Sequence, residues 1–130
     1  MAGESILIVD DNLRYLTLVR TLLQAEGYGV RTAVDAEEAL EVLKAFHPCL
    51  ILMDIQLPGM DGLELTRMLK ANTDTREMTV VAFSGSGIPK TEALDAGCEG
   101  YIAKPIDTRI LIRLVAEYLQ RVEQKNAPSP

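Results

Sequence analysis

The sequence contains no tryptophan, two cysteines and one histidine. Two cysteines as far apart as Cys49 and Cys98 do not make a disulfide framework, so we expect reduced thiols. No apolar run approaches the ~20 residues of a membrane-spanning helix, so membrane insertion is not expected. Basic residues are also scarce: 13 Lys and Arg stand against 19 Asp and Glu, for a net charge of −6. An excess of acidic residues does not favour binding to the phosphate backbone of nucleic acids. We therefore expect a cytoplasmic protein without direct nucleic-acid contacts.

Length and composition are those of one ordinary globular domain. The chain has 130 residues, of which 48% are hydrophobic and 25% are charged. Its last residues, 126–130, are polar and contain two prolines. We therefore expect one domain over residues 1–125 and a flexible tail or linker stub at 126–130.

Two kinds of apolar segment alternate along the chain. Continuous apolar runs at residues 5–9, 49–53 and 79–83 predict buried strands, and residues 28–34 and 100–103 are weaker strand candidates. Apolar residues recur at helical spacing between and after these runs, in the segments 13–23, 36–46, 65–69, 90–96 and 110–122. Such alternation predicts an α/β fold, a doubly wound parallel sheet of five strands with helices on both faces.

Polar residues follow the predicted strands where each one ends. Asp10 and Asp11 follow the first strand, Asp54 follows the third, Ser84 the fourth and Lys104 the fifth. Each of these residues alone is compatible with a helix cap, a turn or an exposed strand end. Parallel strands, however, bring their carboxyl ends to one edge of the sheet, where ligands bind in open α/β folds. We therefore expect the five side chains to meet.

Three carboxylates that meet in this way repel one another unless a cation lies between them. Magnesium, a hard ion with oxygen ligands, suits such a site, and manganese is an alternative. An aspartate placed there can attack phosphorus as a nucleophile, with Lys104 and the Ser84 hydroxyl beside the phosphoryl oxygens. The pattern predicts a phosphoryl acceptor at Asp54.

Three stretches resemble the receiver domains of two-component response regulators, the family that includes the chemotaxis regulators. They are Ile6-Leu-Ile-Val-Asp-Asp-Asn12, Leu50-Ile-Leu-Met-Asp-Ile-Gln-Leu-Pro-Gly-Met-Asp-Gly62 and Gly100-Tyr-Ile-Ala-Lys-Pro105. The resemblance covers nearly the whole chain, and it implies a flavodoxin-like sheet of strand order 2-1-3-4-5. It also implies a signalling module with only self-phosphorylation and self-dephosphorylation activity, not a metabolic enzyme.

The resemblance implies a role for each site residue. Asp54 would accept a phosphoryl group from a sensor histidine kinase or a histidine phosphotransfer protein. Asp11, Asp54 and the backbone carbonyl of Gln56 would bind magnesium directly, and Asp10 would bind it through water. Lys104 would pair with the phosphoryl group.

The family also implies a switch that runs from the acceptor to a protein surface. Ser84 would bond the phosphoryl oxygen and Tyr101 would then rotate inward, changing the face of helix four, strand five and helix five to which a downstream protein binds. Gln56 and Ser86 would tune the rate at which water removes the phosphoryl group. Ser84 replaces the commoner threonine, and the segment from Ser84 to Tyr101 is shorter than is usual, so we expect helix four to begin late, after Pro89.

Three other functions remain possible on this sequence. A degenerate receiver would act as an interaction module without phosphorylation, but the complete set of rim residues argues against it. An aspartate-nucleophile phosphatase needs a second acid two residues after the nucleophile, and Gln56 stands there. A flavodoxin-type carrier needs a hydroxyl-rich loop after the first strand, where Asp10 and Asp11 would repel the flavin phosphate.

Overall fold

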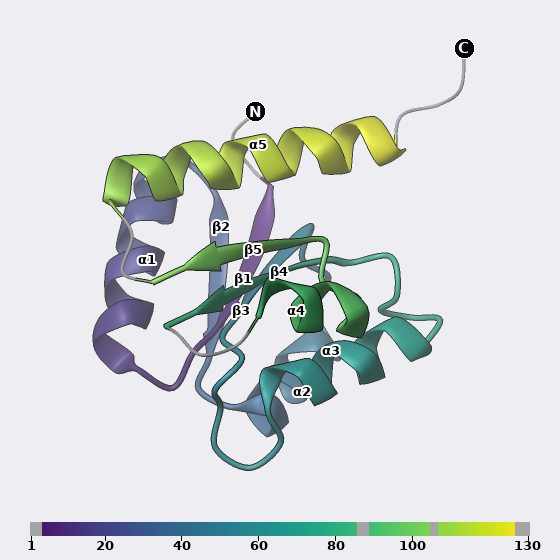
Figure 1. Ribbon diagram of the computed structural model, residues 1–130. Coiled ribbons are helices and arrows are strands. Elements are labelled where there is room, and N and C mark those ends of the chain that lie inside the picture. Colours follow the sequence, from purple (N-terminus) through teal and green to yellow (C-terminus); the bar gives the residue numbers. More distant parts are fainter. Residues whose placement is uncertain (1–3, 86–88, 105–106, 127–130) are drawn as a thin grey trace.

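One parallel sheet organises the protein. The computed structural model describes residues 4–85, 89–104 and 107–126. Its five strands lie in the order β2-β1-β3-β4-β5 and every neighbouring pair is parallel (Figure 1). The strands are β1 (Ser5–Val9), β2 (Gly29–Ala33), β3 (Leu50–Met53), β4 (Thr79–Ser84) and β5 (Gly100–Ala103). The predicted fold class and strand order are confirmed.

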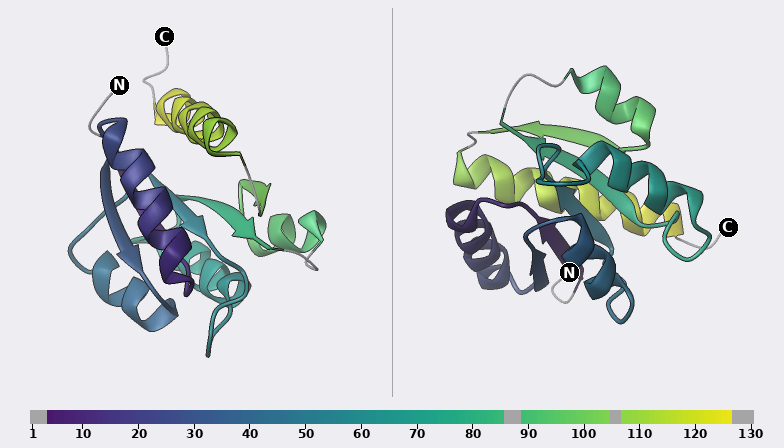
Figure 2. Two further views of the ribbon diagram at one scale, coloured as in Figure 1. Left: turned by 90° about the vertical axis from the view of Figure 1, so that its left-hand side faces the viewer. Right: turned by 90° about the horizontal axis from the view of Figure 1, so that it is seen from below.

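Helices cover both faces of this sheet. They are α1 (Leu13–Ala25), α2 (Ala36–Leu43), α3 (Gly62–Ala71), α4 (Lys90–Ala96) and α5 (Thr108–Asn126). Helices α1 and α5 lie on one face, whereas α2, α3 and α4 lie on the other (Figures 1 and 2). None of the helices in the described part of the chain combines the length and apolar character that crossing a membrane requires.

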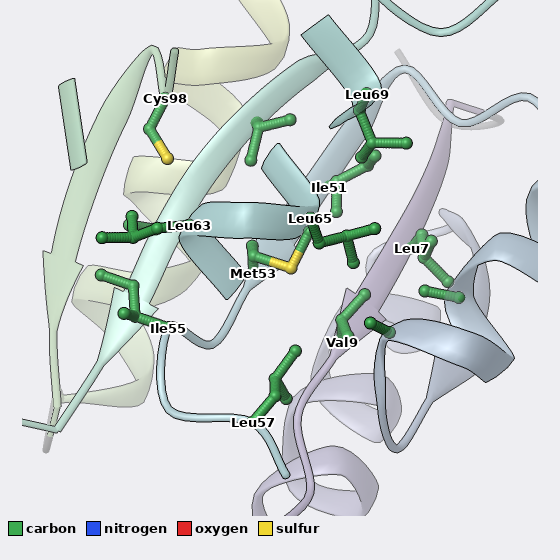
Figure 3. Packing of buried hydrophobic residues seen from close by; sticks show 14 of the residues in the cluster. Leu7, Val9, Ile51, Met53, Ile55, Leu57, Leu63, Leu65, Leu69 and Cys98 are labelled. Carbon is green, nitrogen blue, oxygen red and sulfur yellow. The ribbon is translucent and has the colours of Figure 1, made fainter. Parts of the chain in front are cut away.

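The alternation of side chains along each strand divides the core into two layers. On the α1 and α5 face, Ile6, Ile8 and Phe83 pack against buried residues of the two helices, among them Leu23 and Val115. On the other face the buried strand residues meet α2, α3 and α4 (Figure 3). That layer includes Leu7, Val9, Ile51, Met53, Ile55, Leu57, Leu63, Leu65, Leu69 and Cys98. Strands apolar on both faces are thus explained by two helical layers.

Short polar side chains set where the helices begin. Asn12 Oδ1 accepts from the Arg14 and Tyr15 amides at the start of α1. Asp35 Oδ1 accepts from the Glu38 amide, the first half of a capping box, as the spacing predicts. The α4 helix begins directly after Pro89, also as predicted, and ends at Gly97, whose φ of 111° is in the left-handed region.

Some positions in the helical patterns are not part of the core. Leu13, Met68 and Ile110 are 66%, 44% and 40% exposed, although each fits the apolar spacing of its helix. Apolar periodicity identifies the side of a helix that faces the core. Residues at the edge of that side, or in the first turn, extend beyond the sheet and stay exposed. Asn126, predicted as the first residue of the tail, is the last residue of α5, and residues 127–130 lie outside the described ranges.

Gly62 lies where helix α3 approaches the end of β3. Its amide donates to the Ile55 carbonyl at 2.8 Å, and a Cβ at this position would lie 2.1 Å from the Asp54 carbonyl oxygen. Both contacts are with backbone atoms, which cannot rotate away. Only glycine lets α3 pack this closely to the strand that ends in Asp54.

We predict that Gly62→Ala lowers the free energy of unfolding by about 1–3 kcal/mol, because the backbone beside Asp54 must move. Gly29→Ala is the matched control, since a Cβ on Gly29 meets no atom within 4 Å. The control should stay within about 0.5 kcal/mol of the parent in urea denaturation. Equal stability of the two variants would contradict the close approach.

Candidate functional site

The parallel register brings the predicted site residues to one edge of the sheet. Asp10, Asp54 and Lys104 each follow the last residue of a strand, and their amides continue the ladder. The Asp54 amide donates to the Val9 carbonyl at 2.8 Å, and the Lys104 amide donates to the Ser84 carbonyl at 2.8 Å. The backbone is therefore fixed at the positions from which these side chains emerge.

Three carboxylates meet at this edge. Asp10, Asp11 and Asp54 can each offer one oxygen, and these oxygens lie within 4.8 Å of one another. Asp10 and Asp54 are 1% and 5% exposed, whereas Asp11 is exposed. The three carboxylates thus meet as the sequence predicts, in a cluster that is buried on one side and open to solvent at Asp11.

Lys104 provides the positive charge of the cluster. Its Nζ donates to Asp10 Oδ2 at 2.5 Å and lies 3.5 Å from Asp54 Oδ2. The lysine side chain is 11% exposed, so both ion pairs are shielded from water. One ammonium therefore serves two buried carboxylates.

Backbone amides hold the other oxygen of each buried carboxylate. The Asn12 amide donates to Asp10 Oδ1 at 2.9 Å, and the Gln56 amide donates to Asp54 Oδ1 at 3.1 Å. The Gln56 side chain is exposed at the rim. These bonds fix the orientation of both carboxylates. Gln56 holds Asp54 through its backbone amide and not through its side chain.

The Ser84 hydroxyl is completely buried and finds no hydrogen-bond partner in the described part of the chain. Buried hydroxyls without partners are rare in native proteins, and they often belong to functional sites. Tyr101 is half-buried and packs against the core layer on the α2, α3 and α4 face. Ser86, the other predicted tuning residue, lies outside the described residues.

Two aromatic residues of the site escaped the sequence analysis. The Lys104 ammonium lies 4.5 Å from the ring centroid of Tyr15 and 5.2 Å from that of Phe83. The two rings meet edge to face, with centroids 5.7 Å apart and planes at 80°. Tyr15 lies in the first turn of α1, close in sequence to Asp10 and Asp11, but nothing in the sequence pairs it with Lys104.

Burial changes the acidity of the central carboxylate. It raises the pKa of Asp54 from 3.8 to about 6, with Lys104 and the Gln56 amide lowering it and Asp10 raising it. The loss of hydration therefore outweighs the attraction of Lys104. Above that pKa the ionised Asp54 opposes folding, because the unfolded carboxyl ionises more easily.

The donor set fits a divalent cation. Carboxylate oxygens are the ligands that magnesium and manganese prefer, and three of them within reach of one another provide ample negative charge. A single lysine leaves that charge incompletely balanced. The solvent-open side at Asp11 gives an ion access to the two buried carboxylates.

Comparisons with known proteins agree with the fold and identify the family. The family model "response regulator receiver domain" matches residues 6–116. The polar-differentiation response regulator DivK of Brucella ovis is 39% identical over 118 residues, covering 89% of this chain and 96% of the relative. The chain therefore belongs to the response regulator receiver domains, the signalling modules of two-component systems.

Solved structures show the same likeness. A CheY-like receiver domain protein from Methanospirillum hungatei has a TM-score of 0.88 and 31% identity, covering 96% of this chain and all of that one (100%). The receiver domain of a sensor histidine kinase from Pseudomonas aeruginosa has a TM-score of 0.82 and 30% identity, covering 92% of this chain and 99% of the other. The latter is described with a magnesium ion coordinated in its active-site cleft.

The raised pKa of Asp54 leads to a prediction for the metal-free protein. Because the folded pKa of about 6 exceeds 3.8, the wild type gains stability from Asp54 below pH 3.8 and loses that gain as the pH rises through 6. Asp54→Asn, which cannot ionise, should be more stable than the wild type by about 1–3 kcal/mol at pH 8.

The difference in the free energy of unfolding between Asp54→Asn and the wild type should shrink towards zero near pH 4. Urea denaturation of both proteins in EDTA, at matched pH values, measures it. An Asn variant that is no more stable than the wild type at pH 8 would show that the Lys104 ion pair outweighs the burial.

Proposed function

We propose that the chain is the phosphoacceptor of a two-component phosphorelay and that Asp54 receives the phosphoryl group. The donor would be a phosphohistidine of a sensor histidine kinase or of a histidine phosphotransfer protein. One observation carries the proposal: three carboxylates converge at the strand ends with Lys104 beside Asp54. On the neighbouring strand, the buried Ser84 hydroxyl has no hydrogen-bond partner among the residues that the structure describes. The shielding of both Lys104 and the Ser84 hydroxyl from water distinguishes this site from a cluster of exposed acidic residues.

The metal ligands would be Asp11, Asp54 and the backbone carbonyl of Gln56, with Asp10 acting through a bound water. Asp10 already gives one oxygen to Lys104 and the other to the Asn12 amide, which suits an indirect role. When bound, magnesium supplies positive charge for the phosphoryl oxygens and for the crowded carboxylates. The Pseudomonas aeruginosa kinase receiver domain, a similar structure described with magnesium in its active-site cleft, supports a magnesium site here.

In the transfer step, an Asp54 carboxylate oxygen attacks phosphorus. The new oxygen–phosphorus bond forms as the nitrogen–phosphorus bond of the donor breaks, and the electron pair of that bond stays with the imidazole. Ionised Asp54 carries no proton to lose, so no general base is needed. Lys104, 3.5 Å from Asp54 Oδ2, would pair with the charge on the transferred group. Water would later remove that group, at a rate tuned by the side chains of Gln56 and Ser86.

Ser84 would pass the event to the surface. Once Asp54 carries a phosphoryl group, its oxygens offer the Ser84 hydroxyl a hydrogen-bond acceptor. Because satisfying a buried hydroxyl is favourable, this bond would draw the end of β4 towards the site. Tyr101 on β5, now half-buried against the core, would turn further inward. The two residues thereby link the acceptor to the outer edge of the sheet.

The downstream protein would bind on the face formed by α4, β5 and α5. Strand β5 is the edge of the sheet and lies between these two helices (Figure 1). Leu94 of α4 and Ile110 of α5 are 44% and 40% exposed, so large apolar side chains are available for a partner. A face of this kind could change its fit with the position of Tyr101.

Chemical phosphorylation tests the acceptor. With acetyl phosphate and magnesium, the wild type should gain one phosphoryl group by mass spectrometry, and Asp54→Ala should gain none. Asp74→Asn is the control, because Asp74 is an exposed carboxylate in the segment before β4, at the opposite end of the strand from Ser84. Labelling of Asp54→Ala at the wild-type level would refute the assignment.

Metal binding tests the ligand set. We expect magnesium to bind the wild type in isothermal titration calorimetry and Asp11→Asn to weaken that binding about tenfold or more, through loss of a charged ligand. Asp74→Asn should bind as the wild type does. If Asp11→Asn binds the ion unchanged, the cation is held elsewhere.

A further inference from the structure

The Lys104 ammonium has two kinds of neighbour. On one side are the carboxylates of Asp10 and Asp54, at 2.5 and 3.5 Å. On another are the rings of Tyr15 and Phe83, with centroids at 4.5 and 5.2 Å. Both ring distances lie within the range at which an ammonium is attracted by the quadrupole of an aromatic ring. We call Tyr15 and Phe83 the ring pair.

The ring pair is built into the core rather than laid on the surface. Phe83 is 1% exposed and directly precedes Ser84 on β4, and Tyr15 is half-buried on α1. Their edge-to-face contact, with centroids 5.7 Å apart, ties the helix to the strand. Packing of the core, rather than the charges of the site, therefore holds the two rings in place.

Those charges must change during the proposed reaction. Asp10 and Asp54 cannot remain fully engaged with Lys104 while they also face a divalent cation, and a cation in the cluster repels the ammonium. Asp54 ceases to be a simple carboxylate once it carries a phosphoryl group. Neutral rings neither bind magnesium nor accept the phosphoryl group, so their attraction for Lys104 persists throughout.

We infer that Tyr15 and Phe83 are positioning residues for phosphoryl transfer, which hold the Lys104 ammonium beside Asp54 when the carboxylates are taken by metal and phosphoryl group. The inference rests on the proposed function of Asp54. In the reaction with acetyl phosphate, an Asp54 oxygen bonds to phosphorus while the bond from phosphorus to the acetyl oxygen breaks, and acetate leaves with that electron pair. Lys104 meets the charge on the oxygens of the moving group.

Three variants separate the ring from the hydroxyl and from general packing. Tyr15→Phe keeps the ring, and Tyr15→Leu removes it while keeping an apolar residue of high helix propensity. Tyr28→Leu is the matched control, because Tyr28 is also half-buried and packs against the same core layer but lies before β2, at the opposite end of that strand from the site. The measurement is the phosphorylation rate over a range of acetyl phosphate at saturating magnesium.

We expect Tyr15→Leu to slow the maximal rate about 3- to 30-fold, the factor that corresponds to one shielded cation–ring contact. The half-saturating concentration of acetyl phosphate should change little. Tyr15→Phe and Tyr28→Leu should retain the wild-type rate. In a Lys104→Met background, Tyr15→Leu should have no further effect, since the ring acts through the lysine.

Nuclear magnetic resonance supplies a readout independent of activity. The ε-methylene protons of Lys104 should resonate upfield in the wild type and in Tyr15→Phe, because they adjoin the Nζ atom that lies over the rings. Tyr15→Leu should lose much of this shift. The spectra are recorded with and without magnesium. Retention of the upfield shift in the presence of magnesium is the direct sign that the rings hold the ammonium.

Several results would overturn the inference. The first is a wild-type phosphorylation rate in Tyr15→Leu. The second is a loss of rate in Tyr28→Leu or Tyr15→Phe as large as that in Tyr15→Leu. The third is a full effect of Tyr15→Leu in the Lys104→Met background. A wild-type protein that acetyl phosphate does not label would instead overturn the proposed function, and the resonances of Lys104 would still show whether the ring pair holds it.

Discussion

The whole site depends on one ammonium among buried carboxylates. Lys104 reaches Asp10 and Asp54 from the end of β5, two strands away from β3, and its side chain is nearly shielded from water. Removing two carboxylates from water without such a partner would be prohibitive, so the ion pairs permit the burial. They do not fully compensate it, because the pKa of Asp54 remains raised to about 6. The folded protein thus holds crowded negative charge of the kind that a bound cation offsets.

The sequence predicts the frame of this arrangement well. Continuous apolar runs identify the strands because both faces of the sheet are covered, and the residues at the strand ends meet because parallel strands share a carboxyl edge. Asp10, Asp11, Asp54 and Lys104 therefore follow from local pattern and topology together. Helix limits follow in part from capping residues such as Asp35, whose bond to the Glu38 amide the spacing indicates.

Tertiary contacts explain what the sequence does not predict. Tyr15 and Phe83 carry no polar signature that links them to Lys104, and their role depends on ring positions set by the packing of α1 on β4. Leu13 fits the apolar spacing of its helix yet is 66% exposed, since it lies in the first turn, beyond the reach of the sheet. Side-chain periodicity predicts which side of a helix faces the core, but not how far along the helix the sheet beneath it extends.

Helix α4 differs from the other helices in how it is held. Its seven residues are too few to be helical alone, it begins at Pro89 without a side-chain cap, and its buried residues are Ala93 and Ala96. By contrast, α3 buries Leu63, Leu65 and Leu69. Two alanines contribute far less apolar area than three leucines, so displacing α4 costs less packing energy than displacing α3. Helix α4, which lies between Ser84 and Tyr101 in the sequence and contacts β5, is therefore held more lightly than α3.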